Sequence, residues 1–290
     1  MILVDWGTSS FRAFLARDGQ ILDRRDSAGG ILNVPPGGFK PALEQEVAAW
    51  LAAGERRVLM SGMVGSRQGW VEAPYIACPA GPADLAAALA PAPFEDATVL
   101  IVPGVRGQDG AGVPEVMRGE ETQIVGVLDR IGPDATACLP GSHSKWVTVQ
   151  GGRIAGFETH MTGEAFAALR GHTILGRMMR DGNTDEAAFR RGVTRALQAG
   201  GLLHHLFGVR TQGLFSQLHE TEAASYLSGL LIGHEIAAAA PAQTVHLIGA
   251  PALCGLYALA LEACGALSEI APPEAAAAGL ARIAELAAWN

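Results

Sequence analysis

The sequence predicts an α/β protein of two domains, each built on a mixed β-sheet with helices on its faces. The 290 residues exceed the usual length of a single domain. A strand-turn-strand-turn-strand pattern over residues 1–22 recurs at residues 137–157, and helical patterns follow each copy. We place the boundary near 133–137, which gives an N-terminal domain over 1–135 and a C-terminal domain over 136–290.

In the first half of the chain, the spacing of the apolar residues distinguishes predicted strands from predicted helices. Helices begin near a proline or with acidic residues in the first turn, and glycines follow several of them. The Gly- and Pro-rich stretch 105–114 is expected to be a loop. The predicted strands are 2–4, 11–16, 21–22, 57–61 and 98–102, and the predicted helices are 41–53, 82–89 and 120–128.

The second half repeats the strand block and then becomes mostly helical. The last helix is expected to be able to pack back on the first domain. The predicted strands are 137–139, 145–149, 153–157 and 245–248, and the predicted helices are 164–175, 185–206, 216–238, 252–264 and 274–288.

Composition excludes several classes of protein. With 49% hydrophobic and 17% charged residues, the chain is not intrinsically disordered. A formal net charge of −8 disfavours a nucleic-acid or anionic-membrane binder. The four cysteines form no CxxC pair, and we find neither a signal peptide nor a membrane span, so a cytoplasmic protein with reduced thiols is expected.

The first motif with chemical meaning follows the first strand. Asp5 ends that strand, Gly7 allows a tight turn, and Arg12 lies on the returning strand. An acid at a strand end can hold Mg²⁺ through water, and the amides and hydroxyls of Thr8, Ser9 and Ser10 can cradle phosphate oxygens. An ordinary hairpin turn explains the same residues equally well.

The second motif occupies the equivalent place in the second strand block. One such turn per domain could face the other across a cleft and grip a polyphosphate from both sides. A Ser-His hydrolase is disfavoured because no Gly-x-Ser-x-Gly elbow is present. Lys145 is a candidate phosphate donor or a solvated hairpin lysine. The candidate residues are Gly141, Ser142, His143, Ser144 and Lys145.

A third turn follows the late strand and comprises Gly249, Ala250 and Pro251. Small residues between a buried strand and a helix let the backbone approach a flat ring such as adenine. A lone glycine turn is a weak signal, and it gains weight here because it comes after two paired turns.

Two adjacent acids, Glu120 and Glu121, open a helix just before the second block. A carboxylate facing a cleft can accept a hydroxyl proton during phosphoryl transfer, whereas acids matched to a helix dipole are the plainer explanation. Asp109 is a reserve candidate for the same role.

The loop after strand 57–61 is rich in recognition chemistry. Arg67 offers a bidentate fork for a carboxylate, and an incidental surface arginine is the alternative. Ser66 and Gln68 could bond hydroxyls. Asn33 could bond a substrate hydroxyl, and stabilising a turn is the alternative role. The other candidate substrate-binding residues are Gly62, Met63 and Trp70.

The order of these parts resembles the actin-like ATPase superfamily, with ribonuclease-H-like domains around an interdomain cleft. Five segments in order resemble the 2-dehydro-3-deoxygalactonokinase family: MSGMVGSRQGW, PYIACPAG, EVMRGEETQ, LPGSHSKWV and LIGAPALCGLY. The resemblance spans nearly the whole chain. It implies an ATP-dependent kinase that phosphorylates 2-keto-3-deoxy-D-galactonate at O6 in galactonate catabolism.

The resemblance also implies residue roles. Asp5 matches the acid that supports Mg²⁺, residues 7–10 and 141–145 match the two phosphate loops, and Gly249 with its neighbours matches the adenosine turn. The Gly-Glu-Glu helix start makes Glu121 the first choice for catalytic base and Glu120 the second. The second loop begins Leu-Pro-Gly where many members have Asp-x-Gly-Gly, so binding there should rest on amides and hydroxyls.

Two other functions use the same features. A phosphatase or nucleotidase would take water as acceptor, and a sugar or nucleotide sensor would bind without turnover. A sensor usually carries an extra recognition domain, and no helix-turn-helix or basic extension is visible. The sequence is compatible with a homodimer.

Overall fold

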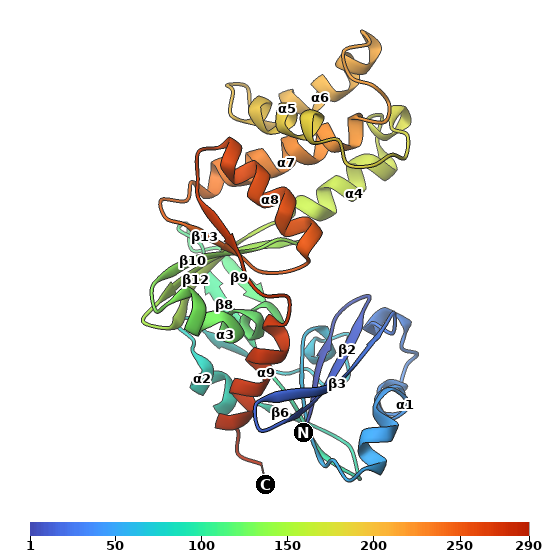
Figure 1. Cartoon of the computed structure of the whole chain (residues 1–290), viewed down its shortest axis with the longest axis vertical. Coiled ribbons are helices and arrows are strands. Elements are labelled where there is room, and N and C mark those ends of the chain that lie inside the picture. The colour runs from blue at the N-terminus through green and yellow to red at the C-terminus, as the bar shows by residue number, and fades with distance from the viewer. Residues whose placement is uncertain (290) are drawn as a thin grey trace. The chain divides into compact units, whose positions relative to one another are not determined.

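The computed structural model describes residues 1–289, which divide into two compact units (Figure 1). The first unit contains residues 1–134, 148–157 and the chain from Glu274 onward. The second contains residues 135–147 and 158–273. Each unit holds helices and mixed β-structure, which confirms the predicted α/β class.

A six-stranded sheet with the order β3-β2-β1-β4-β7-β6 forms the centre of the first unit. The first three strands are antiparallel neighbours, β1, β4 and β7 are parallel, and β6 is an antiparallel edge. In this register Asp5 lies between Arg12 on one neighbour and Ser61 on the other. The strands are β1 (Ile2–Trp6), β2 (Phe11–Arg17), β3 (Gln20–Ser27), β4 (Arg57–Ser61), β6 (Ala90–Ala92) and β7 (Thr98–Ile101).

All five residues of β1 are buried, as expected for an apolar strand covered on both faces. Helix α1 (Phe39–Ala52) packs Leu43, Val47 and Trp50 into the same core. Helix α3 (Glu120–Ile131) packs against the closing helix α9 (Ala275–Leu286), drawn in red in Figure 1. The short helix α2 (Pro82–Ala87) completes the helices of this unit.

The prediction of a loop over 105–114 is wrong at both ends, because 105–108 and residue 114 are paired strand and only 109–113 form the turn between them. Strands β8 (Gly104–Gln108) and β9 (Pro114–Met117) form a hairpin, and β5 (Tyr75–Ala77) adds in parallel to β8. Glycine and proline lower strand propensity, yet tertiary pairing overrides a local preference of this size. The hairpin leads directly into α3 and so sets where its first turn lies.

A five-stranded sheet has the order β12-β11-β10-β13-β14, with β10, β13 and β14 parallel. The tip of the β11–β12 hairpin, residues 148–157, belongs to the first unit. The strands are β10 (Ala135–Leu139), β11 (Ser144–Gln150), β12 (Arg153–His160), β13 (Val245–Leu247) and β14 (Ser268–Ile270).

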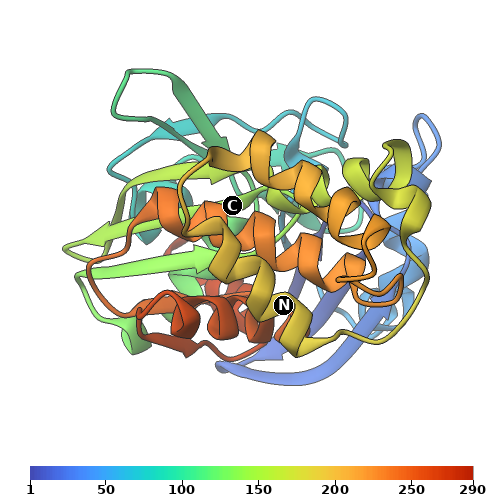
Figure 2. The same cartoon turned by 90° about the horizontal axis from the view of Figure 1, so that it is seen from above.

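Helices make up most of the rest of the second unit, and α7 runs beside α5 in both views (Figures 1 and 2). The single helix predicted over 185–206 is wrong: it is two helices. Gly200 and Gly201 both have positive φ, 131° and 72°, which ends one helix and starts the next. The helices are α4 (Thr162–His172), α5 (Glu186–Ala196), α6 (Gly201–Leu214), α7 (Ala223–Ala239) and α8 (Pro251–Ala263).

The four cysteines are unpaired thiols, with Cys138 and Cys254 buried. Among residues 1–289, no helix combines the length and the apolar character that a membrane crossing requires.

Candidate functional site

The end of β1 carries a buried acid. Asp5 is 7% exposed, and its Oδ2 accepts a hydrogen bond from Arg12 Nη2 at 2.5 Å. Burial raises the pKa of Asp5, and the Arg12 guanidinium opposes that rise. The register explains the pair, because β1 and β2 place these residues directly opposite each other.

The turn after β1 presents three exposed hydroxyl side chains, those of Thr8, Ser9 and Ser10. Backbone hydrogen bonds fix this turn. Gly7 N donates to Ser10 O, and the backbone amides of Ile31 and Leu32 donate to the carbonyl oxygens of residues 7 and 8. Asn33 lies in the neighbouring turn, where its amide donates to Ala28 O at 2.7 Å. The turn therefore holds its hydroxyls outward on a rigid frame.

Close backbone contact joins the end of β1, the loop after β4 and the start of α3. Gly62 has φ of 93°, and a Cβ there would lie 2.8 Å from Trp6 O. A Cβ on Gly119 would lie 3.2 Å from Gly62 Cα. Only glycine fits these two positions, so the backbone itself brings Asp5 and the two acids of α3 into one neighbourhood.

Glu121 is fully buried in this neighbourhood. Its carboxylate accepts from Gly119 N at 2.7 Å and from Thr122 Oγ1 at 2.9 Å. Burial, assisted by the charge of Glu120, raises the pKa of Glu121 to about 8, and the two hydrogen bonds oppose this. Glu120 is half-buried, and its Oε2 accepts from Arg118 N at 3.0 Å.

Several buried polar atoms around this loop have no hydrogen-bond partner within residues 1–289. They are Arg12 Nε, Ser61 Oγ, Ser66 Oγ and Arg118 Nη1. Arg118 is 7% exposed, donates through Nη2 to Ala73 O at 2.7 Å, and stacks over Tyr75. Unpaired buried donors are costly and are typical of places where a polar ligand completes the bonding.

The predicted substrate residues of the loop differ in their surroundings. Arg67 is 87% exposed and lies 3.4 Å from Glu72, whereas Met63 and Trp70 pack against the core. Gln68 and Trp70 line a cavity of about 380 Å³ together with Phe39. The reserve acid Asp109 lies in the β8–β9 turn, where it accepts from Ala111 N and Val113 N.

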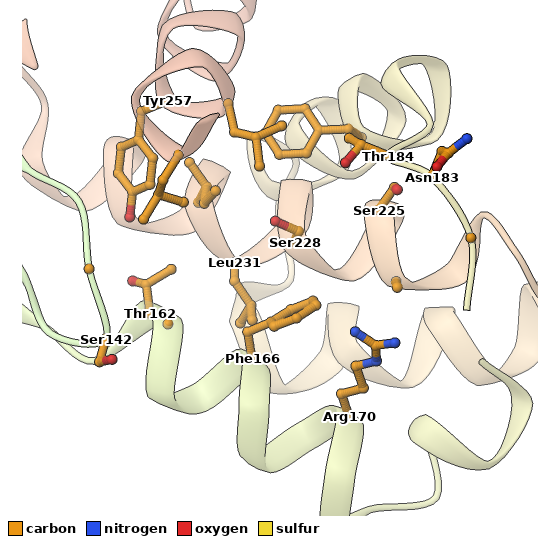
Figure 3. Close-up of a pocket in the computed structure, with 18 of the residues that line it drawn as sticks. Ser142, Thr162, Phe166, Arg170, Asn183, Thr184, Ser225, Ser228, Leu231 and Tyr257 are labelled. Atoms are coloured by element: carbon orange, nitrogen blue, oxygen red, sulfur yellow. The ribbon is translucent and has the colours of Figure 1, made fainter. Parts of the chain in front are cut away.

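A larger cavity of about 410 Å³ lies wholly within the second unit (Figure 3). Gly141 and Ser142 of the second loop line one part of it, and helices α7 and α8 form apolar and hydroxyl-bearing walls. Figure 3 shows Phe166 and Leu231 across from Tyr257. The lining residues include Thr162, Phe166, Arg170, Asn183, Thr184, Ser225, Ser228, Leu231, Leu253, Leu256 and Tyr257.

The residues of the second loop split into exposed and buried sets. Ser142 and His143 are exposed, and His143 pairs with Glu164. Ser144 is fully buried against Tyr257, and Lys145 is buried and donates to Thr159 Oγ1 at 2.8 Å. Groups that remain open to a ligand are therefore concentrated at the start of the loop.

The predicted adenosine turn adjoins this loop. A Cβ on Gly249 would lie 3.6 Å from Pro140 O, and Pro251 opens α8, whose later residues line the cavity. Sequence reasoning missed Arg170, Asn183 and Ser228, because they lie on helices or in a loop without any motif. The helical period of α8 was the one signal that could have indicated Leu253 and Leu256.

In residues 1–289 no three His, Cys, Asp or Glu side chains are arranged to hold a metal ion. The structure gathers Asp5, Arg12, Gly62 and the two α3 acids in one unit, and the second loop, adenosine turn and large cavity in the other.

This fold recurs among solved structures. It matches the activator of the 2-hydroxyisocaproyl-CoA dehydratase from Clostridium difficile with bound ADPNP, with a TM-score of 0.53 and coverage of 98% and 94% of the two chains. The sequences are 13% identical, so this match shows the fold alone. The "Putative N-acetylglucosamine Kinase" from Porphyromonas gingivalis has the same fold, with a TM-score of 0.50 at 14% identity, so the fold is one that sugar-kinase structures share, as the resemblance implied.

The particular family follows from closer matches. A model of the family described as 2-keto-3-deoxy-galactonokinase matches residues 5–283, and the chain belongs to this family. "Probable 2-dehydro-3-deoxygalactonokinase DgoK1" of Rhizobium meliloti (strain 1021) is 39% identical over 99% of this chain and 96% of that protein. A crystal structure from Sinorhizobium meliloti that carries the same enzyme name gives a TM-score of 0.91 at 38% identity, covering 98% of both chains.

Proposed function

We propose that this chain is an ATP-dependent kinase that phosphorylates 2-dehydro-3-deoxy-D-galactonate on its 6-hydroxyl group. Membership of the galactonokinase family supports the substrate. The observation that carries the chemistry is the acid cluster of the first unit: backbone contacts around Gly62 bring the buried Asp5 and Glu121 and the half-buried Glu120 into one neighbourhood. With ATP as phosphate donor, the site of action is the cytoplasm.

The nucleotide site we propose is the cavity of the second unit. Its apolar walls, including Leu253 and Leu256, suit a flat base, and its serine and asparagine side chains suit a ribose and base edge. Gly141 and Ser142 mark the phosphate end. With Ser144 and Lys145 buried, backbone amides and the Ser142 hydroxyl are left to bind phosphate oxygens.

Mg²⁺ fits the residues of the first unit. A carboxylate oxygen is the ligand type that Mg²⁺ prefers, and one or two carboxylates with phosphate oxygens are its usual set in kinases. Arg12 bonds Oδ2 of Asp5, while Oδ1 faces the Gly62 backbone. We propose that Asp5 holds the ion, which when bound neutralises charge on the transferred phosphate.

The proton of the 6-hydroxyl needs an acceptor. We propose Glu121 as the base and Glu120 as the second choice, both fixed at the start of α3. Burial raises the pKa of Glu121 to about 8, so it acts as the base in its ionised form, and kcat should rise with pH toward 8. The hydroxyl oxygen forms a bond to the γ-phosphorus, the bond to the ADP oxygen breaks, and the hydroxyl proton passes to the carboxylate. The Gly119 and Thr122 hydrogen bonds orient the Glu121 carboxylate for this transfer.

Two arginines compete for the substrate carboxylate. Arg67, our sequence choice, is an exposed guanidinium whose ion pair with Glu72 also lies at the surface. Arg118 is buried, already oriented by Ala73, and carries an unpaired Nη1. Arg67→Ala and Arg118→Lys separate them, because the variant that lacks the binding group raises KM for the acid and leaves KM for ATP unchanged.

The test is a coupled ADP-release assay with ATP and Mg²⁺. It compares 2-keto-3-deoxygalactonate, 2-keto-3-deoxygluconate and no acceptor. We expect ADP release with the first acid, at a rate well above the tube without acceptor. Equal release in all three tubes would replace the kinase by a hydrolase, and binding of ATP without any ADP release would replace it by a sensor.

A further inference from the structure

A buried carboxylate outside the proposed reaction sites belongs to a linear chain of hydrogen bonds between four side chains. Glu235 on α7 is 3% exposed. Its Oε1 accepts from Trp146 Nε1 at 2.8 Å, and its Oε2 accepts from the Tyr257 hydroxyl at 2.7 Å. The Tyr257 oxygen lies 2.8 Å from Ser144 Oγ.

The chemistry of the four groups fixes the direction of these bonds. An indole N–H only donates, and the single phenol proton of Tyr257 is directed at Glu235. The Tyr257 oxygen must therefore accept the proton of Ser144. Burial and the Glu235 charge raise the pKa of Tyr257, so the phenol keeps the proton that it donates.

Two members of this chain are parts of the proposed nucleotide site. Tyr257 lines the large cavity (Figure 3), and Ser144 follows the exposed start of the second loop. Trp146 lies two residues further on the same strand, β11. Glu235 thus joins α7, α8 and the second loop through one carboxylate.

We propose that Glu235 is a positioning residue for nucleotide binding: it fixes the Tyr257 ring in the cavity wall and, through it, the Ser144 end of the second loop. This inference rests on the proposed function, which places the nucleotide in that cavity. A buried carboxylate is expensive to desolvate, and apolar side chains would fill a core more cheaply. Its retention at this point is explained by orientation of the cavity wall.

Glu235→Gln tests the direction of the chain at constant shape. The Gln carbonyl must face Trp146, because the indole can only donate, and the amide N–H₂ then faces the Tyr257 oxygen. Tyr257 must turn its proton to Ser144, which reverses that bond. The bonds between the four side chains remain, but they lose the carboxylate charge that strengthens them, so we expect the Kd for ADP to rise about fivefold.

The decisive measurement is a double-mutant cycle by titration calorimetry with ADP, using E235Q, Y257F and the double variant. If Glu235 acts through the Tyr257 hydroxyl, E235Q weakens ADP binding in the wild type and adds nothing in the Y257F background. Unchanged ADP affinity in E235Q overturns the proposal, and so does a loss that is fully additive with Y257F. Val209→Ala is the control for general destabilisation, because Val209 lies in a core cluster of this unit that contains neither Trp146 nor Tyr257.

If E235Q fails to fold, Glu235→Asp replaces it in the same cycle, since it keeps the charge but withdraws the carboxylate from Tyr257. Wild-type protein that binds no ADP would overturn both the nucleotide site and this role of Glu235. Wild-type protein that binds ADP but does not phosphorylate the sugar acid would overturn only the proposed function, and the cycle would still decide on Glu235.

Discussion

The acid cluster of the first unit and the cavity wall of the second unit satisfy their buried polar groups in different ways. Around the acid cluster of the first unit, four buried side-chain atoms of residues 1–289 lack a hydrogen-bond partner, from Arg12, Ser61, Ser66 and Arg118. Beside the cavity of the second unit, four buried side chains form a linear chain of hydrogen bonds, in the order Trp146, Glu235, Tyr257 and Ser144.

This difference separates two kinds of site. A fully bonded polar network holds one arrangement and costs nothing further when a ligand binds, which suits a nucleotide pocket of fixed shape. Unpaired buried donors destabilise a free protein and gain their bonds when a polar ligand arrives. We therefore expect substitutions in the first unit to change sugar-acid binding and catalysis, and substitutions in the second network to change stability and nucleotide binding.

The largest effect is expected at the catalytic acid. Glu121→Gln removes the proton acceptor and should lower kcat by about 10²–10⁴-fold, the usual contribution of a general base. Glu120→Gln should lower kcat less than about tenfold on the same reasoning. Steady-state kinetics with the sugar acid measure both variants.

The control is ADP affinity, which should stay unchanged in both variants, because the proposed nucleotide cavity is built from residues of the second unit. A large kcat loss in Glu120→Gln with a small one in Glu121→Gln would exchange the two roles. That result would mean that the half-buried carboxylate reaches the hydroxyl and the buried one supports it.

A smaller effect is expected for the Asp5–Arg12 pair. Arg12→Ala leaves Asp5 buried with its largest opposing charge removed, and the free energy of unfolding should fall by about 2 kcal/mol. Fully buried pairs lose roughly 3–5 kcal/mol on such a change. Arg12 is 38% exposed, so solvent screens part of the interaction.

Urea unfolding at pH 7 measures this change, and Arg17→Ala is the matched control. Arg17 pairs with Glu55 at 3.0 Å but is 63% exposed, so its loss should change stability by about 0–1 kcal/mol. Equal losses in the two variants would mean that burial of Asp5 does not matter to the pair.

The third effect depends on pH. Burial raises the pKa of Glu121 from its ordinary value of 4.5 to about 8, so the folded protein binds this proton more tightly than the unfolded chain does. The stability that this proton contributes is present below about pH 4.5 and is lost as the pH rises toward 8. Glu121→Gln removes the linkage, so its stability relative to the wild type should increase over that window.

Unfolding free energies at several pH values test this sign, with Glu120→Gln as the comparison. A parallel pH dependence of wild type and Glu121→Gln would mean that Glu121 is ionised throughout. In that case the first unit would hold a buried charge rather than a buried proton.

Much of the first site was predictable, because it is a matter of strand ends and glycines. Asp5 and Ser61 end two apolar runs, and parallel neighbours bring such ends to one edge of a sheet. Gly62 directly follows β4, and Gly119 directly precedes α3. The local sequence therefore indicates both the residues and their proximity.

The second site was less predictable for a physical reason. Its cavity is lined by single residues of several helices, such as Arg170, Ser228 and Leu256, whose spacing depends on helix packing rather than on a motif. The partners of Glu235 lie 89 and 22 residues away along the chain. The sequence of α7 predicts a buried apolar helix. It does not indicate which donors form hydrogen bonds with Glu235, the buried acid of that helix.

The smallest effect, and the most direct test of the contrast between the units, comes from two serines with equal burial. Ser61 is 1% exposed and its hydroxyl has no partner within residues 1–289, whereas Ser144 is fully buried and bonds Tyr257. Ser61→Ala removes an unpaired hydroxyl and should leave the unfolding free energy unchanged or slightly higher. Ser144→Ala breaks a buried bond and should lower it by about 1 kcal/mol.

Binding of the sugar acid should show the opposite ranking. If the Ser61 hydroxyl waits for a ligand, Ser61→Ala raises KM for the sugar acid about fivefold, the worth of one hydrogen bond, and leaves the Kd for ADP unchanged. A loss of stability in Ser61→Ala as large as that in Ser144→Ala would show that Ser61 is already bonded in solution. The two sites would then not differ in whether their buried hydroxyl groups have hydrogen-bond partners in the free protein.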